Sequence, residues 1–360
     1  MSNQCQSSKF KIDESDAAKR LDKFLKEQHP DFSRAFLQKA IQAGQVLVNG
    51  KKTAVHFFLK IGDEVEIKIQ TPKEIEIKAN PAVEILPKCP TSLRQAQGIL
   101  PERSGAESKA CLIHEEPNFL VINKPAGLVV HQAEGHKEPD TLVNGLLARY
   151  PEIAKVGDDL LRPGIVHRLD KEASGVMVVA RTQTMFDHLK SQFKLRQTKK
   201  EYLALVYGQV SPPQGTIEFA LEKKGAKMVA RAKGGGGKEA MTEYEVIAPS
   251  PQSPPIKGVE EKTVFSPLVG RGGNLTLLRL ITHTGRTHQI RVHLFALGHP
   301  IVGDKLYSLS GAERSRRALR QAQGIISGRL MLHAQKLGFY DLAEKWREFE
   351  APTPQEFKFM

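Results

Sequence analysis

The sequence predicts an α+β protein built from two domains. The chain has 360 residues, which is more than one hydrophobic core usually fills. From residue 112 onward, strand-like apolar segments alternate with segments of helical periodicity, and a stretch rich in Pro, Lys and Ser at 71–112 separates this part from the first seventy residues. We therefore expect a small domain at 10–72, a linker with an inserted segment at 73–112, and a larger domain at 113–356.

The charge of the chain indicates a polyanionic partner. Lys and Arg number 53 against 40 Asp and Glu, which gives a formal net charge of +13 at pH 7. Nucleic acid is the commonest partner of so basic a protein, although a solubilising surface charge is the alternative.

The cysteines and the hydropathy pattern favour a cytoplasmic location. Cys5, Cys89 and Cys111 lack the spacing of a metal site, their number is odd, and we expect none of them to need a partner. The N-terminus is polar, and no apolar run approaches the roughly 20 residues of a membrane helix. We expect no membrane association.

The N-terminal segment reads as two helices followed by strands. Residues 17–26 are amphipathic, and a second helix is predicted to begin after Ser33 as its N-cap and to end at Gly44. The segment 46–51 indicates a strand entering a tight Asn-Gly turn, and the alternation at 65–69 indicates a half-buried strand.

Three parts of this segment resemble the α-L RNA-binding module of a small-subunit ribosomal protein. They are RLD at 20–22, SR at 33–34 and AGQVLVNG at 43–50. The resemblance implies that the second helix presents Arg34 and Lys39 to RNA phosphates. A solvated helix face is the alternative for both residues.

Two short sequences occur twice in the chain. LRQAQGI occupies 93–99 and 319–325, and SGAE occupies 104–107 and 310–313. Two distant copies do not make the period of a repeat protein. Our hypothesis is that both are inserted segments in surface loops, so that deletion of 92–109 leaves activity intact.

The larger domain contains three clear strand candidates and one clear helix candidate. Apolar runs at 119–123, 175–180 and 202–207 predict buried strands. The segment 284–297 predicts a helix ended by Gly298 and Pro300, since three apolar residues follow helical spacing: Ile290, Leu294 and Leu297.

The densest polar cluster in the sequence surrounds Asp170. This carboxylate stands beside His167, Arg168 and Lys171, neighbours that favour the ionised form and lower a carboxylate pKa. An ionised carboxylate can attack an electron-poor carbon. On spacing alone, however, a structural ion pair at the start of a strand is the favoured interpretation.

A wider set of motifs resembles the RluA-type pseudouridine synthases, in the order expected of that family. In chain order the segments are VINKPAG at 121–127, GIVHRLDKEASG at 164–175, KKEYLA at 199–204, TGRTHQIRVH at 284–293, GHPIVGD at 298–304 and LMLHA at 330–334. One departure is Ala173, which stands where the family more often has Thr; we expect it to affect loop packing and not the nucleophile.

The resemblance implies a role for each matched residue. Asp170 is the catalytic carboxylate, and Arg168 fills the gap left when the target uridine is flipped out of the RNA. Tyr202 stacks on the uracil and helps to remove the final proton. Arg291 pairs with Asp170 and holds it charged and oriented. Attack at the sugar and attack at the base both remain open, and no cofactor or metal is required.

The resemblance also implies a fold and a substrate. The fold is an α-L RNA-binding domain followed by a catalytic domain with a mixed, mainly antiparallel central sheet flanked by helices. The substrate is RNA, and we expect large-subunit (23S) ribosomal RNA, with transfer RNA as the alternative. We expect the protein to act as a monomer.

Other functions have weaker support in the sequence. Four histidines could suggest a metal site, but five-residue steps on a helix do not place His283, His288 and His293 on one face, and no Cys or carboxylate completes a ligand set. The glycine run at 234–237 lacks the ending of a phosphate-binding loop and is predicted to be a hairpin tip. A non-catalytic RNA-binding protein and a metal- or nucleotide-dependent hydrolase are the competing classes.

Overall fold

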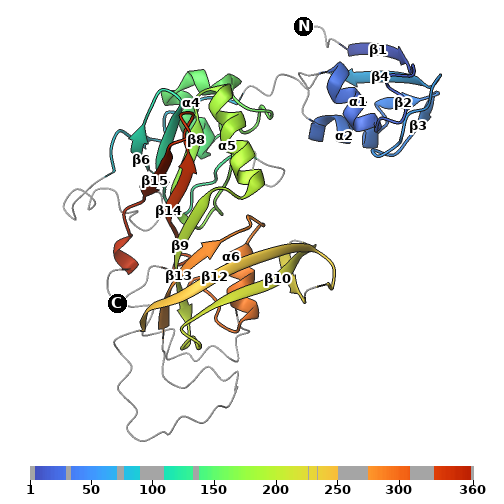
Figure 1. Ribbon diagram of the computed structural model, residues 1–360. Helices are drawn as coiled ribbons and strands as arrows, with labels where there is room; N and C mark the ends of the chain where they lie inside the picture. The colour runs from blue at the N-terminus through green and yellow to red at the C-terminus, as the bar shows by residue number, and fades with distance from the viewer. Residues whose placement is uncertain are drawn as a thin grey trace, which may run out of the picture. The chain divides into compact units, whose positions relative to one another are not determined.

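A computed structural model describes most of the chain (Figure 1). The described residues are 5–29, 34–70, 77–89, 109–132, 138–225, 227–232, 234–249, 275–308 and 328–357. They form two compact units, one made mainly of Met1–Ile77 and the other of Lys78–Gly157 and Arg162–Met360.

The N-terminal unit packs two helices on a small sheet. Its elements are β1 (Cys5–Lys11), α1 (Leu21–Gln28), α2 (Arg34–Ala43), β2 (Val46–Val48), β3 (Lys51–Lys52) and β4 (Glu64–Gln70), and the strand order is β1-β4-β2-β3. The predicted Asn49-Gly50 turn is present, with both residues at positive φ, as a tight hairpin turn requires. The buried faces of both helices and of β2 and β4 share one apolar core.

The first helix begins later than its periodicity predicted. Ala18 adopts a left-handed φ of 61° and donates its N–H to the Leu59 carbonyl, so the helix cannot start at residue 17. Asp22 in α1 is fully buried and accepts hydrogen bonds from Arg20 and from Gln38 of α2. This polar contact joins the two helices.

The predicted boundaries of the first domain and the linker need correction. β1 starts at Cys5 and pairs along its length with β4, so the unit begins before residue 10. The predicted linker 73–112 contains β5 (Ile85–Leu86) and the start of β6 (Ala110–Glu115), which pair in parallel within the large sheet. Backbone pairing with partners distant in sequence decides both cases, and the local sequence pattern does not reveal it.

The second unit is organised around an 11-stranded sheet. Its further strands are β7 (Phe119–Lys124), β8 (Ser174–Ala180), β9 (Lys199–Tyr207), β10 (Gln214–Lys224), β11 (Lys227–Arg231), β12 (Lys238–Pro249), β13 (Leu275–Thr282), β14 (Leu332–Tyr340) and β15 (Trp346–Glu350). The order is β11-β10-β12-β13-β9-β14-β8-β7-β6-β5, with β15 paired to β14. Only β5–β6 and β8–β14 pair in parallel among the described strands, which confirms the predicted mixed, mainly antiparallel sheet.

Helices flank this sheet in two places (Figure 1). α4 (Leu142–Arg149) packs near β5, and α5 (Gln183–Leu195) packs on β8 and β14. α6 (Gln289–Ala296) packs on β10, β11 and β12. Two short 3₁₀ helices, Pro151–Lys155 and Gln355–Phe357, complete the described elements. No helix in the described part of the chain is long and apolar enough to cross a membrane.

The glycine run is not the hairpin tip that the sequence predicted. The hairpin turn lies between β10 and β11, whereas the run at 234–237 lies where the chain passes from β11 across β10 to β12. A Cβ on Gly237 would lie 2.9 Å from the Leu221 carbonyl oxygen, and its φ is 90°. Glycine therefore permits the close crossing of one strand by another.

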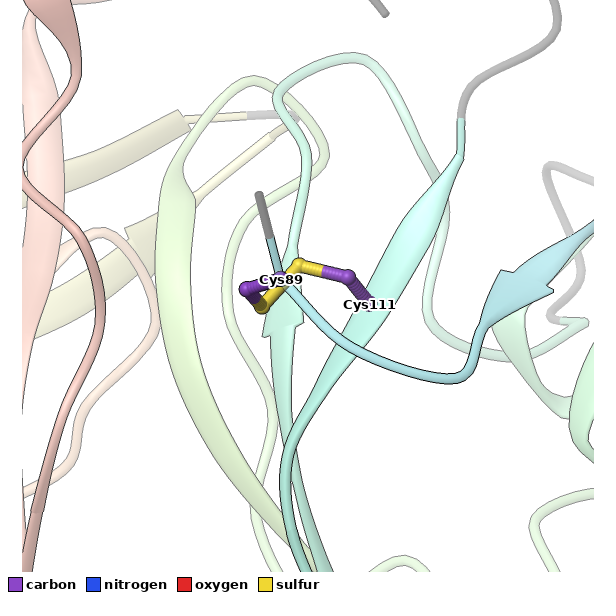
Figure 2. The surroundings of a disulfide bond; sticks show 2 residues. All are labelled: Cys89 and Cys111. Carbon is purple, nitrogen blue, oxygen red and sulfur yellow. A yellow bond between two sulfur atoms is a disulfide. The ribbon is translucent and has the colours of Figure 1, made fainter. Parts of the chain in front are cut away.

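Two cysteines are paired, against our expectation that none needs a partner. Cys89 and Cys111 form a disulfide with their Cα atoms 4.9 Å apart (Figure 2). The chain after β5 runs beside β6, where the Cys89 N–H donates to the Leu112 carbonyl, and this brings the two thiols together. A sequence separation of 22 residues carries no signal of that proximity. The repeated heptapeptides and the SGAE copies lie outside the described residues.

Candidate active site

Asp170 lies in a loop at 164–173 that leads into β8. Gly164 (φ 71°) and Gly175 (φ 124°) bracket the loop, and a Cβ on Gly175 would lie 2.1 Å from the Ala334 carbonyl oxygen of β14. The loop is thus pressed against the centre of the sheet. Ala173 is buried in the core that β9 and β14 share, so this departure from the family pattern is a packing position. The Asp170 side chain remains 17% exposed.

His167 anchors this loop by a hydrogen bond and a ring stack. Its Nε2 accepts the backbone N–H of Val178 at 3.0 Å, and its ring stacks on Phe193 with the ring centroids 4.7 Å apart. Burial lowers the pKa of His167 to about 3, helped by the charge of Lys200, so the ring is neutral and can accept this hydrogen bond.

Lys124 anchors the same loop from the end of β7. Its fully buried ammonium donates to three carbonyl oxygens, those of Pro125 (2.7 Å), Leu128 (2.9 Å) and Lys171 (3.0 Å). Burial lowers the pKa of Lys124 to about 7, while the carboxylates of Asp170 and Glu172 raise it. The residue after Asp170 is therefore tied to the turn that follows β7.

Arg291 of α6 joins Asp170 to a second aspartate. Its Nη1 donates to Asp170 Oδ2 at 3.1 Å, and its Nε and Nη2 donate to Asp304 at 2.7 and 2.9 Å. Asp304 is fully buried and also accepts the backbone N–H groups of Leu306 (2.8 Å) and Tyr307 (2.9 Å). The two-point contact with Asp304 fixes the guanidinium, which in turn orients Asp170.

The pKa values of this pair reflect opposing effects. Burial opposes the charge of Arg291, but its hydrogen bonds to Asp304 and Asp170 raise its pKa above the usual value. Burial likewise acts to raise the pKa of Asp304, yet the contacts with Arg291 and two backbone N–H groups bring it below its usual value. Both groups are therefore charged at neutral pH.

The helix that carries Arg291 is shorter than the predicted 284–297. α6 begins at Gln289, because the buried Gln289 amide holds the preceding loop onto β12. The amide oxygen accepts from the Thr284 hydroxyl (2.7 Å), and the amide nitrogen donates to the Met241 carbonyl (3.0 Å). His288 has a left-handed φ of 54°, which a helix does not allow. Leu297 is 38% exposed and does not extend the buried stripe of Ile290 and Leu294.

Tyr202 lies on β9, within electrostatic range of Asp170. Burial raises the pKa of Tyr202 to about 12; a hydrogen bond with Thr282 lowers it and the Asp170 charge raises it. The phenol is therefore protonated at neutral pH. The structure thus gathers Asp170, Tyr202 and Arg291 from a loop, a strand and a helix that are distant in sequence.

The three predicted RNA-contact residues have different standings. Arg168 is exposed and makes no hydrogen bond or ion pair with any other described residue, so its cation is available to a ligand. Arg34 and Lys39 lie on α2, but their side chains are outside the described part of the structure.

The histidines considered as metal ligands have separate surroundings. His283 pairs with Glu243 at 2.9 Å, His288 bonds to Tyr307, His293 is buried, and His299 bonds to the Tyr207 carbonyl. Among the described residues no group of three or more His, Cys, Asp or Glu side chains could hold a metal ion.

Sequence reasoning missed four residues of this site. Lys124 and Asp304 lie within matched segments. The available signal for Lys124 was a lone charge at the end of an apolar strand, and for Asp304 it was a lone charge after a Pro-Ile-Val-Gly run. His288 was weighed only as a metal ligand. Tyr307 gave no signal; its ring lies over Arg291, with the guanidinium carbon 5.1 Å from the ring centroid.

Comparison with known proteins gives two matching families. The RNA pseudouridylate synthase profile matches residues 118–296, and the S4 domain profile matches residues 19–65. The first range contains Asp170, Tyr202 and Arg291. The second contains both helices of the N-terminal unit, its short strands β2 and β3, and the start of β4.

Curated relatives and a solved structure resemble the chain over most of its length. An uncharacterised RNA pseudouridine synthase of Aquifex aeolicus is 34% identical over 94% of this chain and 92% of its own. The ribosomal large subunit pseudouridine synthase D of Escherichia coli K12 is 31% identical, covering 96% and 90%. The human RNA pseudouridylate synthase domain containing 1 has a TM-score of 0.51 at 26% identity, covering 70% of this chain and 87% of that one.

Proposed function

The chain belongs to the RNA pseudouridylate synthase family and is an RNA pseudouridine synthase, and from this premise we propose that it isomerises uridines of large-subunit ribosomal RNA with Asp170 as its nucleophile. The observation that carries the proposal is the contact of Asp170 with Arg291, which is itself fixed by buried Asp304. A non-catalytic RNA-binding protein has no need of a partly exposed carboxylate oriented by an arginine that a buried aspartate holds at two points.

The geometry supports a proposed task for each group in the isomerisation. Arg291 donates to Oδ2 of Asp170, so Oδ1 lacks this hydrogen bond and is the oxygen to which we assign the reaction. Either route, attack at the sugar or at the base, needs a carboxylate whose reacting oxygen is held in place. The loop anchors at His167 and Lys124 supply that fixed placement.

Tyr202 and Arg168 act on the extruded base and on the vacated stack. The ring of Tyr202 is neutral and close to Asp170, so it offers a face for stacking on uracil. With a pKa of about 12 the phenol is protonated, so it can accept the final proton only if it donates its own hydroxyl proton to another acceptor at the same time. Arg168 has the free cation and the exposure needed to enter the RNA where the uridine has left.

Ribosomal RNA is favoured over transfer RNA as the substrate. The chain carries an S4 domain, its net charge is +13, and it aligns along nearly its full length with proteins named for the large ribosomal subunit. We propose that Arg34 and Lys39 of α2 add phosphate contacts that hold this RNA.

The test of the nucleophile is Asp170→Asn, assayed by tritium release from RNA labelled at uracil C5. We expect turnover to fall on the order of 10³-fold or more, because an amide cannot replace the carboxylate. Asp187→Asn on the exposed face of α5 is the matched control and should retain wild-type turnover. Turnover of Asp170→Asn at the wild-type rate would refute the mechanism.

The test of the substrate is a map of pseudouridines in cells with and without the protein. Loss of sites in large-subunit ribosomal RNA supports the proposal, and loss confined to transfer RNA contradicts it. For the N-terminal unit, the pair Arg34→Ala and Lys39→Ala should weaken RNA binding and reduce the slope of log affinity against log salt by about 2. Lys345→Ala, at an exposed turn of the other unit, is the control.

A further inference from the structure

Tyr307 connects the hairpin of β10 and β11 to the catalytic carboxylate. The Met228 backbone N–H of β11 donates to the Tyr307 hydroxyl oxygen at 3.0 Å. The same oxygen lies 2.9 Å from His288 Nδ1. His288 Nε2 in turn lies 4.0 Å from Asp170 Oδ1, the oxygen that Arg291 leaves free.

The donors in this chain of contacts determine which nitrogen of His288 carries the proton. The Tyr307 oxygen accepts from Met228, so its own hydroxyl hydrogen needs an acceptor. Among the described residues His288 Nδ1 is the acceptor within reach. Neutral His288 then carries its proton on Nε2, directed at Asp170.

His288 is neutral in these surroundings. Burial lowers its pKa, and the cations Arg291 and Arg168 lower it further, while the carboxylates Asp170 and Asp304 raise it. The ring is therefore a hydrogen-bond donor toward Asp170 without adding a second positive charge beside Arg291.

The backbone of His288 is held in an unfavourable conformation by its neighbours. A φ of 54° is uncommon for a residue with a Cβ, and such strain persists only where the surroundings determine it. Here Gln289 supplies that restraint, since its amide accepts from the Thr284 hydroxyl and the Arg286 N–H and donates to Met241 and Thr242. These hydrogen bonds fix the backbone from which the His288 side chain projects.

We propose that His288 is a positioning residue, which presents its Nε2–H to Asp170 Oδ1 and takes its tautomer from Tyr307. The inference rests on the proposed role of Asp170. In the free enzyme the separation is 4.0 Å, and we expect it to shorten to a hydrogen bond when RNA closes the site. Arg291 and His288 would then hold the two oxygens of one carboxylate.

The test compares substitutions of His288 that differ in reach. His288→Gln retains an N–H at about the Nε2 position, whereas His288→Asn tolerates the left-handed backbone but is too short, and His288→Ala has no donor. We expect kcat to fall about 10-fold or more for the Asn and Ala variants, to stay within about 3-fold for Gln, and KM to change less than about 2-fold throughout. His283→Gln, in the same loop but paired with Glu243, should match wild type.

Tyr307→Phe tests the source of the tautomer. It should lower kcat, and the double variant with His288→Ala should be no slower than His288→Ala alone, because Tyr307 acts through His288. Full activity of His288→Ala, equal losses for Gln and Ala, or multiplicative losses in the double variant would each overturn the inference. Asp170→Asn separates the two ideas: if it is inactive while His288→Ala is fully active, only the role of His288 fails.

Discussion

Replacing Asp304 with asparagine should destabilise the catalytic unit because it leaves a buried cation without its main partner. Asp304 accepts two hydrogen bonds from Arg291 and two from backbone N–H groups, and its side chain is fully buried. The Asn oxygen can keep the two backbone contacts, but the charge that balances Arg291 is lost. The Arg291 side chain is only 9% exposed, so water cannot solvate the guanidinium well enough to compensate for the lost carboxylate.

The expected cost follows from the burial of the pair. Removal of one partner from a buried ion pair costs about 3–5 kcal/mol in the free energy of unfolding. For a unit of this size each kcal/mol shifts the midpoint of thermal unfolding by about 2–4 °C, so we expect a decrease of roughly 6–20 °C. Thermal and urea unfolding followed by circular dichroism measure both quantities.

Asp341 supplies a matched control for this substitution. It also accepts from one arginine, Arg347, and from two backbone N–H groups, but its side chain is 14% exposed and that of Arg347 is 23% exposed. Asp341→Asn should cost less than about 1 kcal/mol, as surface pairs do. If the losses in free energy of unfolding caused by Asp304→Asn and Asp341→Asn differ by less than about 1 kcal/mol, burial is not the reason that the Arg291–Asp304 pair stabilises the unit.

Three further outcomes are expected. Arg291→Lys should lower kcat about 10- to 100-fold in the tritium assay, because an ammonium cannot bridge two carboxylates with the fork of a guanidinium; unchanged kcat would show that the bridge is dispensable. Burial lowers the pKa of His333 to about 3, so between that pH and about 6.5 the unfolded chain binds a proton that the folded chain does not. The free energy of unfolding should therefore decrease as the pH is lowered through this window, and His333→Asn should reduce this slope by about 1.4 kcal/mol per pH unit in urea titrations. Equal slopes would contradict it. Cys111→Ser should lower the free energy of unfolding by about 3 kcal/mol under oxidising conditions and by little under reducing ones.

The sequence predicted the elements whose signals are local. β7 and β8 are apolar along most of their length, β9 is apolar from Tyr202 onward, and each strand contains the run predicted for it, because strand segments buried on both faces need apolar residues at successive positions. The Asn49-Gly50 turn was equally clear, since few residue pairs accept positive φ twice. The contact of Asp170 with Arg291 was expected from the family resemblance and not from a local signal, and the structure contains it.

The features that were missed depend on contacts between distant parts of the chain. The start of α6 is set by hydrogen bonds of Gln289 to β12, almost fifty residues earlier, so helical periodicity extended the prediction five residues too far. The Cys89–Cys111 pair needed the course of the chain beside β6. Asp304 contacts Arg291 and Tyr307 contacts His288, and no pattern in the sequence around either residue indicates that partner.

The Cys89–Cys111 disulfide changes what a cut in the intervening segment can do. The segment between these two cysteines includes the first LRQAQGI copy, and any protease site in it lies inside a covalent ring. A chain cleaved there remains one molecule, with the N-terminal S4 part still attached to the part that carries Asp170, until the disulfide is reduced. The S4 domain and the catalytic domain are therefore joined by two covalent connections at this point. One is the peptide backbone, and the other is a disulfide that reducing conditions break.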